Sequence, residues 1–308
     1  MEQNPVRHIL FPLLAALIWG TAFAAQSVCA RYLPPFTVNA LRSAIAVAAL
    51  LPASLAFDGA KRRRRNAERT DRPMLLRGSL VCGGLLSFGV NLQQAGLADT
   101  AAGKAGFITA FYVVLVPVFG VFLRKKAGPR IWASVALVSV GLWLLCIRPE
   151  ERVVLERSDG FLMICAVFYA LQVLAVDRYA RYVDGLKLSI GQFVVTGLVS
   201  AFLALLFERG GWSAEGLRAC ALPLLYVGAV SSGVGYTLQI LAQRGGNPTL
   251  VSLLFSMESV FSVLAGAALL GDRLSGREYL GCAVMSAAVI LAQIPEKSKK
   301  SGKSVAIN

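Results

Sequence analysis

The chain has 308 residues, of which 56% are hydrophobic and only 16% are charged, and its mean hydropathy is +0.64. Soluble domains carry about 25% charged residues, so this composition excludes an ordinary soluble enzyme and a disordered chain. Because one bilayer crossing takes about 20 apolar residues, the length accommodates about ten crossings joined by short connections.

The net charge of +14 follows a pattern typical of membrane topology rather than of nucleic-acid binding. Most basic residues lie in short segments between apolar runs, and the densest cluster is Lys61–Arg65. We therefore expect no nucleic-acid partner, and we interpret this cluster as a topology anchor that contacts anionic lipid.

Ten apolar segments follow one another along the chain, and all are expected to be helices because open strands would leave backbone groups unsatisfied in lipid. They lie at about residues 9–29, 36–57, 74–97, 103–123, 131–147, 159–176, 187–207, 220–242, 249–270 and 278–294. With the N-terminus inside, the cytoplasmic segments carry 21 Lys and Arg and the outer segments carry 9. This asymmetry favours a multi-pass protein of the cytoplasmic (inner) cell membrane with both termini in the cytoplasm.

Weak self-similarity predicts two halves. Ala-Arg-Tyr occurs at 30–32 and again at 180–182, and at a similar offset Ser87, Asn91 and Gln94 match Ser232, Tyr236 and Gln239. We expect a short cytoplasmic N-terminus (1–8), five-helix repeats at 9–148 and 158–294, and a basic cytoplasmic tail (295–308). Because five is odd, the second repeat would enter the membrane from the opposite side, as in many secondary transporters. The expected fold is therefore an all-α polytopic membrane protein with ten transmembrane helices in two inverted repeats.

Several short motifs, taken in order, resemble the EamA-type family of the drug/metabolite transporter superfamily. They are Leu-Ile-Trp-Gly-Thr (17–21), Asn-Ala-Leu-Arg-Ser (39–43), the run at 105–117, Met-Glu-Ser-Val-Phe (257–261) and Leu-Leu-Gly-Asp-Arg-Leu-Ser (269–275). The chain departs from the family where Ser259 replaces a frequent Pro and Asp272 a frequent Glu. The first-half counterpart of Asp272 is the basic stretch 124–126.

This resemblance implies a ten-helix carrier that works by alternating access, often as an exporter of metabolites or amino acids. Such carriers run as facilitators or as proton-coupled exchangers, and the residues leave this choice open. We expect a small-molecule substrate, lipid as the surroundings, and a monomer or homodimer.

Enzyme chemistry finds little support in the sequence. The single histidine, His8, excludes a two-histidine metal site, and no G-x-x-x-x-G-K-[ST] loop is present. The six cysteines are scattered without a C-x-x-C pair, so we expect packing residues rather than a disulfide framework or a metal site. We expect no cofactor and no bound metal.

Two polar stripes are candidate walls of a transport cavity. Asn91 and Gln94 share one face of the third helix, and Tyr236 and Gln239 share the corresponding face of the eighth. In lipid, such a face must turn toward protein or water. The alternative is a dry interhelical contact, worth only about 0.6 kcal/mol on average.

Glu258 lies near the middle of its segment, where a charged side chain costs about 2.5–3.5 kcal/mol. It is either a neutral group bonded to a neighbouring helix, or a contact for a substrate amine or a proton-carrying site. Arg42 lies inside the second segment and has three alternatives. It binds a substrate carboxylate, pairs with Glu258, or extends outward to the interface.

Trp19 lies too deep in the first helix for the interfacial aromatic belt. Trp19 and Tyr112 are candidates for the cavity wall, with core packing as the alternative.

The interpretation favoured by these residues is a secondary transporter of a small metabolite, such as an amino acid. Two alternatives stay open: a non-transporting membrane protein, such as an assembly factor or sensor, and a flippase for lipid-linked headgroups.

Overall fold

The computed structural model describes residues 5–63, 71–100, 102–123, 128–147, 156–211, 213–270 and 275–294. Every regular element in these ranges is a helix, and none is a strand. Arg64, Arg65, Asp272, the basic stretch 124–126 and the tail 295–308 lie outside the described residues.

The first half of the chain contains six helices. They are α1 (Pro5–Tyr32), α2 (Pro35–Arg63), α3 (Arg72–Asp99), α4 (Ala102–Ala110), α5 (Tyr112–Phe122) and α6 (Pro129–Cys146).

The second half contains nine helical elements, one of them a π-helix. They are α7 (Arg157–Tyr179), α8 (Gly185–Phe207), α9 (Ala214–Ala219), α10 (Ala221–Leu225), the π-helix η1 (Tyr226–Gly235), α11 (Tyr236–Gln243), α12 (Pro248–Phe255), α13 (Met257–Leu270) and α14 (Gly276–Gln293).

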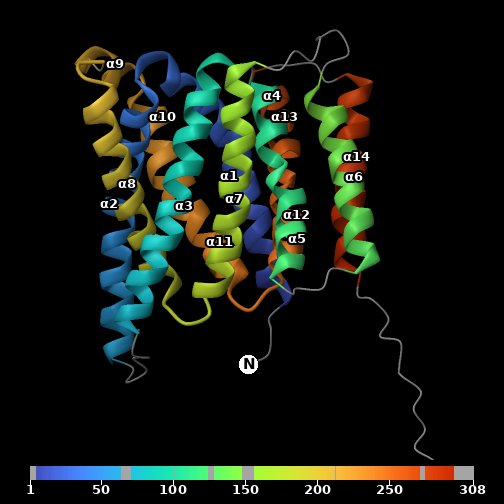
Figure 1. Cartoon of the computed structure of the whole chain (residues 1–308), viewed down its shortest axis with the longest axis horizontal. Coiled ribbons are helices and arrows are strands. Elements are labelled where there is room, and N and C mark those ends of the chain that lie inside the picture. Colours follow the sequence, from blue (N-terminus) through green and yellow to red (C-terminus); the bar gives the residue numbers. More distant parts are fainter. Residues whose placement is uncertain are drawn as a thin grey trace, which may run out of the picture.

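Eight helical stretches are long and apolar enough to cross a membrane, and Pro129–Leu145 in α6 is a shorter apolar helix. The helices run side by side as one bundle (Figure 1). We therefore describe the chain as a multi-pass membrane protein. The exposed large hydrophobic side chains, such as Leu55, Phe122, Leu198 and Leu205, suit contact with lipid tails.

The helix starts follow local sequence signals. The side chains of Asp71, Asp184 and Asn247 cap the N-termini of α3, α8 and α12. Ser275 and Glu278 form a reciprocal capping box at the start of α14. These caps satisfy backbone N–H groups that have no partner within the helix.

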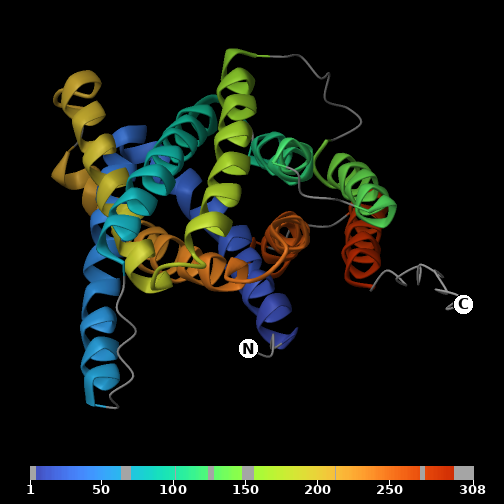
Figure 2. The same cartoon turned by 60° about the horizontal axis from the view of Figure 1, so that its bottom comes forward.

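Helix α6 packs mainly against α14, and this pair lies at one side of the bundle (Figures 1 and 2). Arg130 at the start of α6 donates to the carbonyl of Ile294, and Arg277 at the start of α14 donates to the carbonyl of Trp143. The two antiparallel helices are therefore joined by a hydrogen bond at each end.

Helices α2 and α8 form a second antiparallel pair, which is also tied at both ends. At one end, the Glu208 carboxylate accepts from the backbone N–H groups of Phe36 and Thr37, each at 2.7 Å, and from the Thr37 hydroxyl at 2.8 Å. At the other end, Lys187 Nζ lies 2.8 Å from Asp58 Oδ2. Glu208 thus caps a helix that lies 171 residues away in the sequence.

We expect Glu208→Ala to lower the free energy of unfolding by about 1.5–3 kcal/mol, because hydrogen bonds to a charged group are lost and the α2 N-terminus is uncapped. Unfolding in detergent measures this. The matched control is Glu215→Ala, which removes an exposed carboxylate from α9. Equal stability of the two variants would contradict the capping role.

Candidate functional site

A cavity with about 50 Å³ of space open to water lies between helices of both halves. Six of the eight predicted site residues line it: Trp19, Arg42, Tyr112, Tyr236, Gln239 and Glu258. The structure therefore brings these residues together from α1, α2, α5, α11 and α13.

Two slightly irregular turns lie beside this cavity, at Phe111 between α4 and α5 and at Ser256 between α12 and α13. Both residues keep right-handed helical backbone angles. The stretches Ala105–Phe122 and Pro248–Ala265 are therefore each one continuous helix, long enough to cross a membrane. Thr109 and Tyr112 flank the first turn, whereas Phe255 and Glu258 flank the second, and all four line the cavity.

The eighth apolar segment contains the π-helix η1, and this wider turn also contacts the cavity. Trp19 Nε1 donates to the Ser231 carbonyl oxygen at 3.3 Å. A side chain at Gly235 would collide with the Trp19 indole, so the bare backbone there allows α1 to approach. π-helical turns are frequent at functional sites.

Glu258 lies in the first turn of α13 and is 6% exposed. Within the described part of the chain, its carboxyl group makes no hydrogen bond and no ion pair. Glu258 is therefore a buried acidic group that faces the cavity without a protein partner.

Arg42 is 3% exposed and bonds only neutral oxygens in the described residues. Its Nε donates to Ser232 Oγ at 2.9 Å, and its Nη1 donates to Gln26 Oε1 at 3.1 Å. These bonds use two of the five N–H donors of a guanidinium group, which leaves three for a ligand. Among the described residues Arg42 makes no ion pair with Glu258, and its side chain is buried within the bundle.

Gln239 and Tyr112 add polar atoms without protein partners. Gln239 Nε2 donates to Gln172 Oε1 at 2.9 Å, and Gln172 Nε2 donates to Gln192 Oε1 at 3.3 Å. Among the described residues, Gln239 Oε1 and Tyr112 Oη are buried and have no hydrogen-bond partner. Buried polar atoms are usually bonded, so these two are positions where a bound molecule or water would bond.

Aromatic rings form one wall of the cavity. The Trp19 ring centroid lies 5.0 Å from that of Tyr236 and 5.1 Å from that of Phe255, both in tilted geometry. The neighbouring Gly20 lets α1 pack against α13, because a side chain there would meet the Glu258 carbonyl. In the Trp-Gly motif, Trp19 thus lines the cavity and Gly20 allows the close contact between α1 and α13.

Asn91 and Gln94 lie outside this wall, unlike the other six predicted site residues. Asn91 Nδ2 donates to Ser87 O at 2.8 Å and to Ser200 Oγ at 2.9 Å, and Asn91 Oδ1 accepts from Asn39 at 2.9 Å. Gln94 Nε2 donates to the Gln26 carbonyl at 3.4 Å. The stripe on α3 therefore connects helices instead of facing the cavity at these two positions.

Nine further residues line the cavity that the sequence did not single out as its wall: Phe23, Gln26, Gln93, Thr109, Tyr169, Gln172, Val173, Ser231 and Phe255. Most lie beside the turns at Phe111 and Ser256 or on α7, which carries Tyr169 and Gln172. Tyr169 Oη donates to Gln93 Oε1 at 3.0 Å. The sequence gave one sign of this wall. Tyr169 lies 150 residues after Trp19, and the same offset separates the two Ala-Arg-Tyr motifs.

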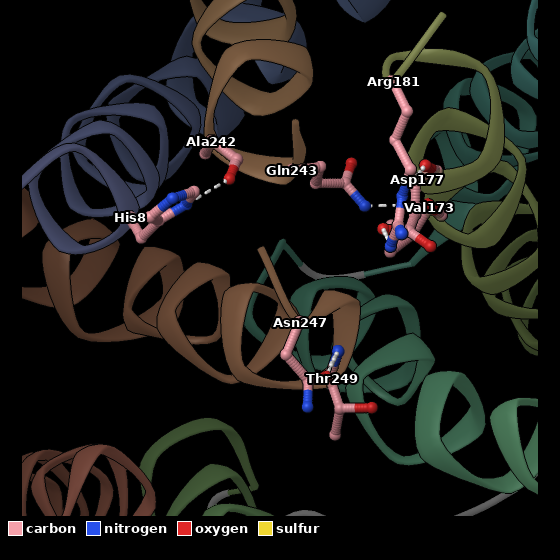
Figure 3. Close-up of polar contacts among 8 residues, drawn as sticks. All are labelled: His8, Val173, Asp177, Arg181, Ala242, Gln243, Asn247 and Thr249. Atoms are coloured by element: carbon pink, nitrogen blue, oxygen red, sulfur yellow. Dashed lines mark hydrogen bonds and ion pairs between the residues drawn. The ribbon is translucent and has the colours of Figure 1, made fainter. Parts of the chain in front are cut away.

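Polar contacts hold several helices together at the bundle end that carries the N-terminus (Figure 3). His8 Nδ1 donates to the Ala242 carbonyl at 2.9 Å, and Gln243 Nε2 donates to the Val173 carbonyl at 2.8 Å. These bonds join α1 to α11 and α11 to α7. Neither of these two bonds is an ion pair, whereas Arg181 and Asp177 nearby form one within α7 and the turn after it, at 2.9 Å.

The described residues hold no group of three or more His, Cys, Asp or Glu side chains arranged to bind a metal ion.

Comparison with known proteins gives a consistent result. The EamA-like transporter family matches residues 6–147 and again residues 157–293. The chain belongs to the EamA-like transporter family, within the drug/metabolite transporter superfamily.

Two individual proteins are similar over most of the chain. One is an uncharacterized transporter of Archaeoglobus fulgidus, 26% identical over 287 residues, which span 91% of this chain and 84% of that protein. The other is a solved crystal structure with a TM-score of 0.76 and 21% identity, covering 93% of this chain and 96% of the other. This structural likeness shows the same fold.

In a variant without native cysteines, we expect Gln239→Cys to react with a water-soluble thiol reagent and Asn91→Cys to stay unreactive. The reason is that Gln239 faces the cavity, whereas Asn91 is bonded between helices. Labelling of membranes followed by mass spectrometry measures both. If the two positions react equally, the cavity boundary described above is wrong.

Proposed function

We propose that this EamA-like transporter is a secondary carrier that exports a small metabolite bearing an amine and a carboxylate, such as an amino acid. The proposed path runs through the central cavity. The observation that carries the proposal is Glu258, a buried acidic group that lines this cavity without a partner. A group in this position is costly unless it serves a ligand or a proton.

Charge complementarity supports a zwitterionic substrate. Arg42 keeps three N–H donors that fit a carboxylate, while Glu258 and Gln239 Oε1 offer acceptors to an amine. We further propose that Glu258 carries a proton when no substrate amine is bound. Exchange of the substrate amine for a proton at Glu258 would couple export of the substrate to entry of the proton.

We propose ten crossings in two inverted repeats. The ten are α1, α2, α3, α6, α7, α8 and α14, together with α4–α5, α10–η1–α11 and α12–α13. The helix contacts support this symmetry, since most have a counterpart. Helix α3 packs on α7 as η1 and α11 pack on α1, and α3 packs on α8 as η1 packs on α2. Helix α1 packs on α13 as α4 and α5 pack on α7.

We also propose that the protein lies in the inner membrane with cytoplasmic termini, as the distribution of Lys and Arg supports. The His8 and Gln243 bonds would then close the cytoplasmic end and break when the cavity opens inward.

The proposal predicts that cells overproducing the parent accumulate a compound in their medium that is absent with Glu258→Gln. Loss of a charged contact worth about 1.5–3 kcal/mol lowers transport by about 10- to 100-fold. Untargeted metabolite analysis of the medium measures this, at protein levels matched by immunoblot.

The matched control is Glu215→Gln, which alters an exposed carboxylate on α9 and is expected to transport like the parent. Equal export by the parent and Glu258→Gln would refute the role of Glu258. If no compound appears outside with any variant, export is wrong, and uptake becomes the direction to measure.

A further inference from the structure

Three buried glutamines from three helices form one hydrogen-bonded chain beside the cavity. Gln239 of α11 donates through Nε2 to Gln172 Oε1 of α7 at 2.9 Å, and Gln172 Nε2 donates to Gln192 Oε1 of α8 at 3.3 Å. All three side chains are at most 2% exposed. Among the described residues, the two end atoms of the chain, Gln239 Oε1 and Gln192 Nε2, have no hydrogen-bond partner. The chain therefore has a direction, since both bonds run from an N–H group toward Gln192.

This direction decides which atom of Gln239 faces the cavity. A carboxamide carries an acceptor oxygen on one side and a donor nitrogen on the other. In the reverse direction, Gln192 would donate to Gln172, Gln172 would donate to Gln239, and Gln239 would turn its NH₂ group to the cavity. Gln239 cannot turn alone, because its oxygen would then face Gln172 Oε1, and two acceptors do not bond. The three amides are therefore oriented together.

Gln192 differs from the other two members because it lies behind the cavity wall. Gln172 and Gln239 line the cavity, whereas Gln192 does not and is 0% exposed. Its backbone is held from the far side. Helix α3 packs so closely there that a side chain at Gly83 would collide with the Gln192 carbonyl oxygen, and the Thr196 hydroxyl donates to that same oxygen at 2.8 Å. Gln192 thus contacts the cavity only through Gln172 and Gln239.

The first region that matches the transporter family contains a related arrangement. Arg42 lies 150 residues before Gln192, on α2, and it bonds Gln26 of α1 as Gln192 bonds Gln172 of α7. Both Gln26 and Gln172 line the cavity. Arg42 also lines the cavity itself, and its charge acts there directly. The neutral Gln192 acts from a distance, through the orientation of the amides in front of it.

We propose that Gln192 is a positioning residue that sets the polarity of the cavity wall. By accepting from Gln172, it turns the Gln239 oxygen toward the cavity, where this oxygen accepts from the amine of the substrate. The atom of Gln192 that matters is Oε1, because Nε2 bonds nothing among the described residues. The part of the proposal that concerns the amine rests on the proposed function, whereas the coupling of the three amides does not.

The first test measures the coupling in the full chain, purified in detergent with glutamine side chains labelled with nitrogen-15. Nuclear magnetic resonance then reports each side-chain amide, because a hydrogen bond shifts its proton signal. We expect Gln192→Met to shift the signals of both Gln172 and Gln239, although Gln239 makes no bond to Gln192. The matched control is Gln293→Met on α14, which also removes a buried Nε2 without a partner among the described residues. It is expected to leave both signals in place.

The conservative variant Gln192→Glu keeps an acceptor oxygen at the same reach, so we expect the Gln172 and Gln239 signals to stay close to those of the parent. A shift of Gln172 alone in Gln192→Met would overturn the coupling, and so would equal shifts in Gln192→Met and Gln293→Met. Signals in Gln192→Glu that match those of Gln192→Met would overturn the role of the oxygen. If Gln192→Met does not insert, Gln192→Asn moves the oxygen out of reach by one methylene group and carries the same expectations.

A second arm tests the effect on transport by untargeted metabolite analysis of the medium, at matched protein levels. Loss of one oriented hydrogen bond to the substrate amine is expected to lower export of the amine-bearing compound by about 2- to 10-fold in Gln192→Met. Gln192→Glu and Gln293→Met are expected to export like the parent. Unchanged export by Gln192→Met would overturn the positioning role. If the parent exports no amine-bearing compound, the proposed function fails, and the amide signals still decide the coupling separately.

Discussion

The rest of the structure depends on one constraint: a buried acidic group inside a membrane must have a partner or a use. An uncompensated charge near the bilayer centre costs about 2.5–3.5 kcal/mol on insertion scales. Glu258 lacks a partner among the described residues, although polar side chains lie close to it across the cavity. Beside it, Gly20 lets α1 approach α13 closely, and Gly235 lets α1 approach the π-helical turn of η1.

Polar groups in this bundle do two different jobs, and their partners separate them. Asn91 has all its bonds within the protein and joins α3 to its neighbours. Gln239 has one bond to Gln172 and one oxygen that is left unpaired at the cavity. A polar group with all its bonds inside the protein, such as Asn91, makes the bundle more rigid. A polar group with an unpaired atom at the cavity, such as Gln239, remains available to a ligand. The same residue types on equivalent stripes therefore differ in function.

The sequence predicted the helical membrane architecture because hydropathy and backbone satisfaction leave few alternatives. It also predicted six residues that the structure brings to one cavity, since intramembrane charge and deep aromatic residues are visible in sequence. The π-helical turn of η1 was not predicted, because its residues show no local sequence signal for it. The exclusion of Asn91 from the cavity wall was not predicted either, because it depends on hydrogen bonds between distant helices.

The state of Glu258 tests the central claim most directly. Dicyclohexylcarbodiimide couples to protonated carboxyl groups in apolar surroundings, and peptide mass spectrometry of treated membranes locates the adduct. The account predicts an adduct on Glu258 and none on the exposed Glu215, with less adduct when the exported compound is present. Absence of modification at Glu258, while exposed carboxylates react, would contradict an unpaired acidic group in an accessible cavity.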